Sequence, residues 1–155
     1  MSGPTVRVLV DAQGVAEAAA DQVIEAGIAA VAARGVFHLC TTGGSTPAAL
    51  YRALREPSRA NRMPWAQTQI WFGDDRFVPR ADPLSNVSPL DAQLLSPSAD
   101  GASSPLSPSA VHPWPTTAAD APTVVTAYLA ELRDAGVPHT PRGFPIFDLL
   151  LIGIG

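Results

Sequence analysis

Short apolar segments alternate with segments of helical periodicity along this chain of 155 residues. Apolar and β-branched side chains predict strands at residues 5–10, 35–42, 68–74 and 147–155. Helical spacing predicts helices between them, at about residues 11–33, 47–55, 85–95 and 123–135. Two strands joined by a helix lie parallel, because the helix carries the chain back across the sheet. The alternation therefore predicts an α/β fold, a Rossmann-like open parallel sheet with helices on both faces.

The first predicted helix has clear boundaries and an apolar stripe. Asp11 is a suitable N-cap, and Arg34 followed by Gly35 is typical of a helix C-terminus. The face expected to pack on the sheet carries apolar side chains at helical spacing, namely Val15, Ala19, Val23, Ile24, Ile28 and Val31.

Two segments depart from this regular alternation. Residues 96–123 are rich in Pro and Ser, a composition that does not pack a core, so we expect a mobile surface loop there. The chain stops at Gly155, directly after an apolar strand that would need a crossover and a covering helix. We therefore interpret residues 1–155 as a single α/β domain that is incomplete at its C-terminus, truncated after the fourth strand.

Composition excludes several classes of protein. With 46% hydrophobic and 15% charged residues the chain is typical of a globular protein. A net charge of -4 argues against a nucleic-acid-binding surface. Cys40 is the only cysteine, so no intrachain disulfide can form. The N-terminus lacks the pattern of a signal peptide, and no apolar segment predicts a membrane span. We interpret the protein as cytoplasmic and leave its oligomeric state open.

The sequence TTGGSTP follows the second predicted strand, at the edge of the sheet where open α/β folds bind ligands. Gly43 and Gly44 allow a close approach and a positive φ, while Ser45 and Thr46 offer hydroxyl groups. Pro47 suits the first position of a helix. Free amides and the helix dipole favour an anion in this turn, most often phosphate. The alternative is a capped tight turn without a ligand, and the tandem glycines and hydroxyls favour the anion site.

A second polar cluster, in the sequence WFGDDRFVP, follows the third predicted strand. One interpretation is local: Asp74 or Asp75 caps the turn or pairs with Arg76. The functional interpretation is that Arg76 holds a phosphate or carbonyl oxygen and that Asp74 orients a hydroxyl or a water. Ser85 and Asn86 either complete a polar wall of the same site or cap the next helix, and the sequence favours neither.

Three motifs in order, GGSTPAALY, WFGDDRFVPRADPLSN and FDLLLIGIG, resemble those of 6-phosphogluconolactonases. These enzymes belong to the wider group of glucosamine-6-phosphate isomerases and deaminases. The motifs frame residues 36–155, with no matching pattern in the Pro/Ser-rich segment. The resemblance implies hydrolysis of a small-molecule phosphosugar lactone, 6-phospho-D-glucono-1,5-lactone, to 6-phosphogluconate in the pentose phosphate pathway. It implies no metal and no organic cofactor.

The resemblance also implies roles for individual residues. The phosphate would lie on Gly43, Gly44, Ser45 and Thr46, with help from Arg76. A water would attack the ring carbonyl, with a histidine as general base and cationic donors at the developing oxyanion.

That histidine belongs to an Asp-Gly-His stretch just beyond the strand that here reads LLLIGIG, and the chain ends before it. His38 lies in mid-strand and is interpreted as packed, whereas His112 and His139 lie in Pro-rich connections and are interpreted as surface residues. Asp75 stands where the family usually has the longer Glu. We therefore expect this chain alone to be inactive or nearly so.

Two other functions fit parts of the same pattern. An amino-sugar phosphate isomerase or deaminase would share the fold, but those enzymes usually carry a MDEY-like stretch where this chain reads GDDR, and Arg76 favours the lactonase. A non-catalytic phosphosugar-binding module is the second alternative. The closing Gly-Ile-Gly resembles half of a dinucleotide fingerprint, yet it lacks the third glycine and a following helix.

Overall fold

The computed structural model describes residues 5–97, 101 and 103–153 of the chain. Its helices and strands are α1 (Ala12–Arg34), β1 (Phe37–Thr41), α2 (Ser45–Arg55), α3 (Pro57–Ala60), η1 (Trp65–Gln67), β2 (Thr68–Phe72), α4 (Ser88–Leu90), η2 (Asp91–Leu95), η3 (Pro108–Ala110), β3 (Val111–His112), α5 (Ala121–Asp134) and β4 (Leu149–Leu150). The strands form one sheet in the order β3-β2-β1-β4, and all neighbours are parallel. The predicted α/β fold with an open parallel sheet is confirmed.

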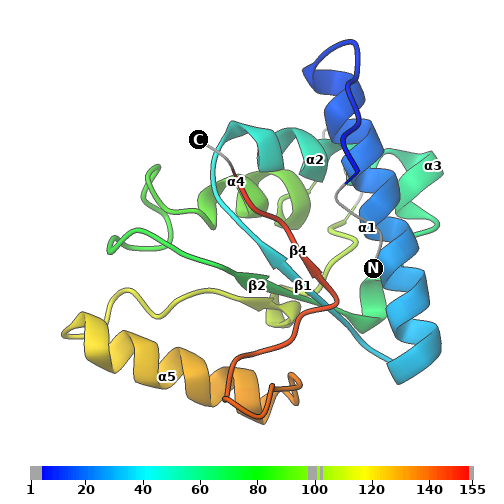
Figure 1. Cartoon of the computed structure of the whole chain (residues 1–155). Coiled ribbons are helices and arrows are strands. Elements are labelled where there is room, and N and C mark those ends of the chain that lie inside the picture. The colour runs from blue at the N-terminus through cyan, green and yellow to red at the C-terminus, as the bar shows by residue number, and fades with distance from the viewer. Residues whose placement is uncertain (1–4, 98–100, 102, 154–155) are drawn as a thin grey trace.

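Helices cover both faces of this sheet (Figure 1). On one face, α1 and α2 pack on Phe37 and Leu39 of β1 in the larger core cluster. On the other face, Cys40 of β1 and Trp71 of β2 pack with Tyr128 of α5 in a separate cluster. Successive side chains of a strand point to opposite faces, so an apolar strand such as β1 serves both cores.

Helix α1 packs on the sheet through a face that mixes small residues with Val23 and Ile24. Asp11 caps its N-terminus, as predicted, and Gly35 ends it with a φ of 77°. The predicted apolar stripe is partly wrong, because Val15 and Ile28 are exposed. Gly27 lies so close to β1 that an added Cβ would be 3.1 Å from the Phe37 ring. The buried side of the helix therefore combines Val23 and Ile24 of the predicted stripe with small residues, namely Ala16, Ala20, Gly27 and Ala30.

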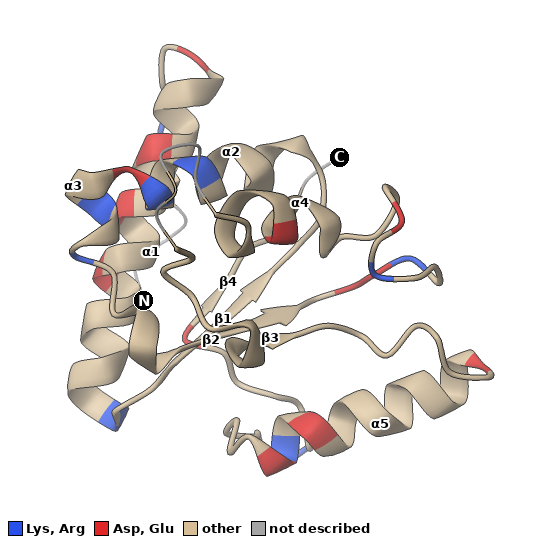
Figure 2. Cartoon of the chain, turned by 180° about the vertical axis from the view of Figure 1, so that it is seen from behind, with Lys and Arg blue, Asp and Glu red and all other residues tan. Residues whose placement is uncertain are grey.

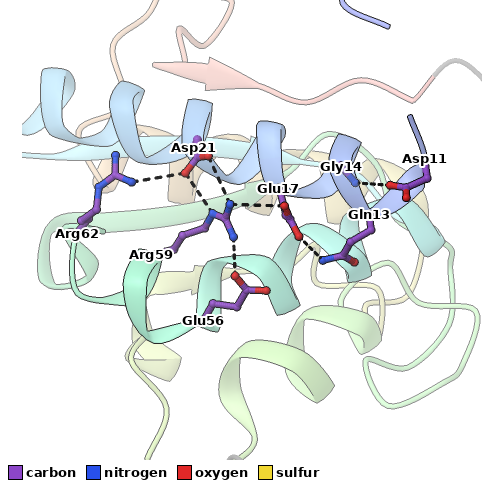
Figure 3. A network of polar contacts seen from close by, with 8 residues as sticks. All are labelled: Asp11, Gln13, Gly14, Glu17, Asp21, Glu56, Arg59 and Arg62. Carbon is purple, nitrogen blue, oxygen red and sulfur yellow. Dashed lines mark hydrogen bonds and ion pairs between the residues drawn. The ribbon is translucent and has the colours of Figure 1, made fainter. Parts of the chain in front are cut away.

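Charged side chains tie α1 to α3 (Figure 3). Arg59 of α3 donates to Asp21 of α1 with 3.1 Å between Nε and Oδ1, and it also pairs with Glu17 and Glu56. The Arg59 side chain is only 14% exposed, whereas its carboxylate partners are 41% to 45% exposed. This network fixes the short helix α3 on the outer side of α1.

The strand predicted at residues 5–10 does not form. Val6, Val8 and Val10 are 84%, 90% and 101% exposed. A strand needs a neighbour for its N–H and C=O groups, and within the described part of the chain the sheet ends at β3 and β4 without reaching this segment. β-Propensity alone therefore gave a wrong prediction here.

The segment 96–123 contributes to the core, contrary to the expectation of a surface loop. It contains β3, which pairs with β2, and it buries Leu106 and Val111. Composition misled the prediction because a few apolar residues among Pro and Ser suffice for one short edge strand. Residues 98–100 and 102 of this segment lie outside the described residues.

The last strand is shorter and less buried than predicted. Within the described residues, the pairing with β1 covers Leu149 and Leu150, and Leu150 is 49% exposed. Asp148 fixes the start of this strand, because its Oδ2 accepts a hydrogen bond of 2.8 Å from the His38 amide and its Oδ1 pairs with Arg34. Ile152 is exposed, and residues 154–155 lie outside the described residues.

Candidate functional site

The glycine turn, residues 42–44, leads from the end of β1 into α2. Gly44 is the N-cap residue and has a φ of 108°, which glycine adopts at little cost. The helix begins at Ser45, so Pro47 occupies its third position. The prediction that Pro47 is the first residue of the helix is therefore wrong. Pro47 fits at the third position because the first N–H groups of a helix have no intrahelical partner.

The N-terminus of α2 differs from those of the two longer helices. Asp11 accepts a hydrogen bond from the Gly14 amide at the start of α1, and Asp120 accepts one from the Thr123 amide at the start of α5. At α2, no side chain of the described residues caps the helix. Its first N–H groups and the positive end of its dipole are therefore available to an anion.

A cleft of about 560 Å³ opens beside the glycine turn. Residues 42–46 form its polar wall, and Gly44, Ser45 and Thr46 are exposed. The opposite wall is apolar and includes Val15 of α1 and Leu151 after β4. The cleft therefore combines polar groups that suit an anion with an apolar surface, as small-molecule sites commonly do.

The structure brings together Gly43, Gly44, Ser45 and Thr46, all of which were predicted from the sequence, on this cleft. The apolar wall was missed. Its residues come from α1 and from the segment after β4, which only the fold places next to the turn. The spacing of Val15 in the helical pattern predicted burial against the sheet and gave no signal for a cleft.

The second polar cluster lies in the loop that follows β2, where Figure 2 shows red acidic and blue basic segments beyond the end of the strand. Asp75 points inward: its Oδ1 accepts hydrogen bonds of 2.7 Å from the amides of both Arg76 and Asn86. Asp74 and Arg76 are exposed, and neither belongs to the walls of the cleft as the described residues define them. The roles of Asp74 and Arg76 toward a ligand remain predictions.

Ser85 and Asn86 are buried beside Asp75 and do not cap α4. The Ser85 hydroxyl donates to Asp75 Oδ2 over 3.2 Å, and the Asn86 side-chain amide donates to the Asp74 carbonyl over 3.0 Å. Both residues therefore hold the two ends of the 74–86 loop together. The sequence gave their side-chain chemistry but not these partners.

Aromatic side chains anchor the end of β2, from which this loop departs. The Tyr128 hydroxyl accepts a hydrogen bond of 2.9 Å from the Phe72 amide and donates to the Phe72 carbonyl over 3.1 Å. Trp114 donates to the same carbonyl over 2.8 Å and stacks on Tyr128 with 4.0 Å between ring centroids. Sequence reasoning missed Tyr128, whose partners come from a distant strand.

The three histidines lie elsewhere in the fold. Trp71 donates to His38 Nδ1 over 3.2 Å, and burial lowers the pKa of His38 despite the nearby Asp148 carboxylate. His112 is not a surface residue, because its ring is held between Glu131 and Gln69 at 2.6 Å each and its side chain is 13% exposed. Within the described residues, no histidine lines the cleft at the glycine turn.

Tyr51 anchors α2 on β1 below the turn. Its hydroxyl lies 2.8 Å from Thr41 Oγ1, and burial raises the pKa of Tyr51 to about 12, so the phenol stays neutral. Residues 5–97, 101 and 103–153 contain no group of three or more His, Cys, Asp or Glu side chains that could hold a metal ion. No helix in this part of the chain is long and apolar enough to cross a membrane.

An open parallel sheet with an uncapped glycine turn at its carboxyl edge defines a class of α/β proteins that bind small ligands at that edge. Residues 10–155 match the family model of glucosamine-6-phosphate isomerases and 6-phosphogluconolactonases. The chain belongs to this family.

Individual relatives agree with this family assignment. The chain is 34% identical over 149 residues to a 6-phosphogluconolactonase of Streptomyces coelicolor, a match that covers 94% of this chain and 55% of that protein. It is 33% identical over 157 residues to the 6-phosphogluconolactonase of Synechocystis, with 98% and 59% covered. The solved structure of Trypanosoma brucei 6-phosphogluconolactonase superposes with a TM-score of 0.78 at 24% identity, covering 99% of this chain and 60% of that one. The chain thus spans little more than half the length of these relatives.

Proposed function

We propose that the protein hydrolyses 6-phospho-D-glucono-1,5-lactone to 6-phosphogluconate, and that this chain supplies the phosphate-binding half of the site. The observation that carries the proposal is the uncapped N-terminus of α2, which lines the cleft together with the exposed hydroxyls of Ser45 and Thr46. The chain that carries this feature belongs to the family named above. Backbone N–H groups at a helix N-terminus bind phosphate through hydrogen bonds and the helix dipole.

In this proposal the amides of Gly44, Ser45 and Thr46 hold the phosphate, and Gly43 lets it approach the backbone. Arg76 contributes a positive charge to the phosphate or to the oxyanion that forms at the ring carbonyl. Asp74 orients the attacking water. The apolar wall excludes bulk water from the sugar ring.

Hydrolysis also needs a general base, because the attacking water loses a proton as its oxygen bonds to the carbonyl carbon. None of the three histidines described lines the cleft. We therefore expect the 155-residue chain alone to be inactive or nearly so, with lactone hydrolysis close to the spontaneous rate. A lactone assay checks this expectation, and clear turnover by the purified chain would contradict it.

Binding is tested separately from turnover, by NMR titration of the ¹⁵N-labelled chain with 6-phosphogluconate. The amides of Gly44, Ser45 and Thr46 are expected to shift the most. Gluconate, which lacks the phosphate, is the matched control and is expected to leave them unchanged. Unmoved amides at saturating 6-phosphogluconate refute the proposal, and a stronger response to glucosamine 6-phosphate favours the amino-sugar phosphate enzymes.

A further inference from the structure

The loops that follow β1 and β2 are in direct contact. β1 and β2 are neighbours, with Thr41 paired to Phe72 at their carboxyl ends. One residue further on, the Gly73 amide donates to the Thr41 carbonyl over 2.9 Å. The glycine turn and the 74–86 loop therefore leave the sheet side by side.

Asn86 is the side chain of the 74–86 loop that meets the glycine turn. A Cβ added to Gly43 would lie 1.8 Å from Asn86 Oδ1 and 2.2 Å from Asn86 Cγ. These distances are far below van der Waals contact, so the Asn86 side chain occupies the space where any other residue at position 43 would carry its Cβ.

The two glycines of the turn are needed for different reasons. Gly44 has a φ of 108°, and nothing lies within 4 Å of a Cβ added there. Gly43 is not among the glycines with positive φ, so the left-handed conformation that favours glycine at position 44 is not the reason for glycine at position 43. At position 43 the nearest atoms to an added Cβ all belong to Asn86, so the structure shows a steric requirement for glycine there that the Asn86 side chain imposes.

Asn86 is itself held firmly. Its backbone amide donates to Asp75 Oδ1 over 2.7 Å, and its side-chain amide donates to the Asp74 carbonyl over 3.0 Å. Ser85 donates to the other oxygen of Asp75, and Asn86 is only 8% exposed. The Asp75 carboxylate therefore fixes Asn86 from the far side of the loop.

We propose that Asn86, seated by Asp75, is a positioning residue that sets the glycine turn in the conformation that binds phosphate. With one side of Gly43 covered by Asn86, the following amides are directed into the cleft. A neutral amide suits this place because a carboxylate so close to the turn would repel the anion. This inference rests on the proposed function, whose phosphate lies on the same turn.

A double-variant cycle tests the proposal in the 155-residue chain. Gly43→Ala is expected to raise the Kd for 6-phosphogluconate at least tenfold, because the methyl group collides with Asn86. In the Asn86→Gly background the same change is expected to raise the Kd less than threefold. Glycine is needed at position 86 because the Asn86 Cβ itself would lie 2.9 Å from the new methyl group.

Gly44→Ala is the matched control. Its cost arises from a positive φ and not from a neighbour, so its effect on the Kd is expected to be the same with and without Asn86→Gly. Rescue that is selective for position 43 shows the contact with Asn86. The positioning role is tested by Asn86→Gly alone, which is expected to raise the Kd for 6-phosphogluconate while the chain stays folded, and an unchanged Kd overturns that role. Equal losses from Gly43→Ala in both backgrounds overturn the proposal.

Two further measurements keep the outcomes distinct. If the unaltered chain does not bind 6-phosphogluconate, the proposed function fails. The cycle is then measured without ligand, by the change that Gly43→Ala causes in the chemical shifts of the Gly44 and Ser45 amides and in the unfolding midpoint, with and without Asn86→Gly. If Gly43→Ala does not fold, folding of the Gly43→Ala/Asn86→Gly variant supports the proposal. Failure of both variants to fold, while Asn86→Gly alone folds, refutes it.

Discussion

The Tyr128 hydroxyl is expected to contribute measurably to stability through the end of β2. Tyr128 is 2% exposed, and its hydroxyl oxygen accepts the hydrogen bond of the Phe72 amide. The pairing of β2 with β3 ends at Trp71, one residue before Phe72, so Tyr128 takes the place of a strand partner. Tyr128→Phe removes this acceptor and leaves a buried N–H group unpaired, at a cost of about 1–3 kcal/mol. The Phe72 carbonyl keeps its hydrogen bond from Trp114, so the amide carries most of the loss.

For a domain of this size, about 2 kcal/mol corresponds to a fall of about 4–8 °C in Tm. Thermal unfolding followed by circular dichroism measures it. Tyr51→Phe is the matched control, because Tyr51 is equally buried but bonds to the side-chain hydroxyl of Thr41, which can rotate. We expect the control to cost about 1 kcal/mol. A Tyr128→Phe variant at least as stable as Tyr51→Phe refutes the reasoning.

Three further outcomes are expected. Burial lowers the pKa of His38 in the folded chain below 6.5, so the unfolded chain binds the proton first and stability falls as the pH drops below about 6.5. The His38→Gln variant is therefore expected to lose less Tm than the unaltered chain between pH 7 and pH 5. An unchanged dependence of Tm on pH contradicts this. Burial raises the pKa of Cys40 to about 12, so iodoacetamide at pH 8 is expected to label the thiol only after unfolding, and rapid labelling of the folded chain argues against it. Asp148→Ala removes the acceptor of the His38 amide and loosens the start of β4. Hydrogen exchange at Leu151, whose amide donates to the Cys40 carbonyl, is therefore expected to accelerate, and equal protection in both chains counts against the role given to Asp148.

Local pattern was sufficient for the parts of the fold that depend on neighbours in sequence. Asp11 and Gly35 bound α1 as predicted, because capping uses groups within one turn of the helix. The buried strands β1 and β2 were also predicted, since a run of apolar residues fits a strand covered on both faces. The glycine turn followed from the same reasoning, and the family followed from the order of three motifs.

Predictions failed where pairing between distant segments decides the structure. Residues 5–10 have the composition of a strand but no neighbour in the described sheet, whereas Val111 pairs with β2 from within a Pro/Ser-rich segment. In both cases the backbone hydrogen bonds depend on a partner far away in the sequence, which local propensity does not contain.

The sequence by itself determined the chemical groups of the candidate site: two glycines, two hydroxyls, and an acidic and basic cluster after the next strand. Tertiary structure alone decided which of these groups line the cleft and what packs against them. The parallel register of β1 and β2 brings Asn86 onto Gly43, and the packing of α1 and the end of β4 adds the apolar wall of the cleft. Residues 43 and 86 are far apart in the chain, and their contact exists only because the two strands end at the same edge of the sheet.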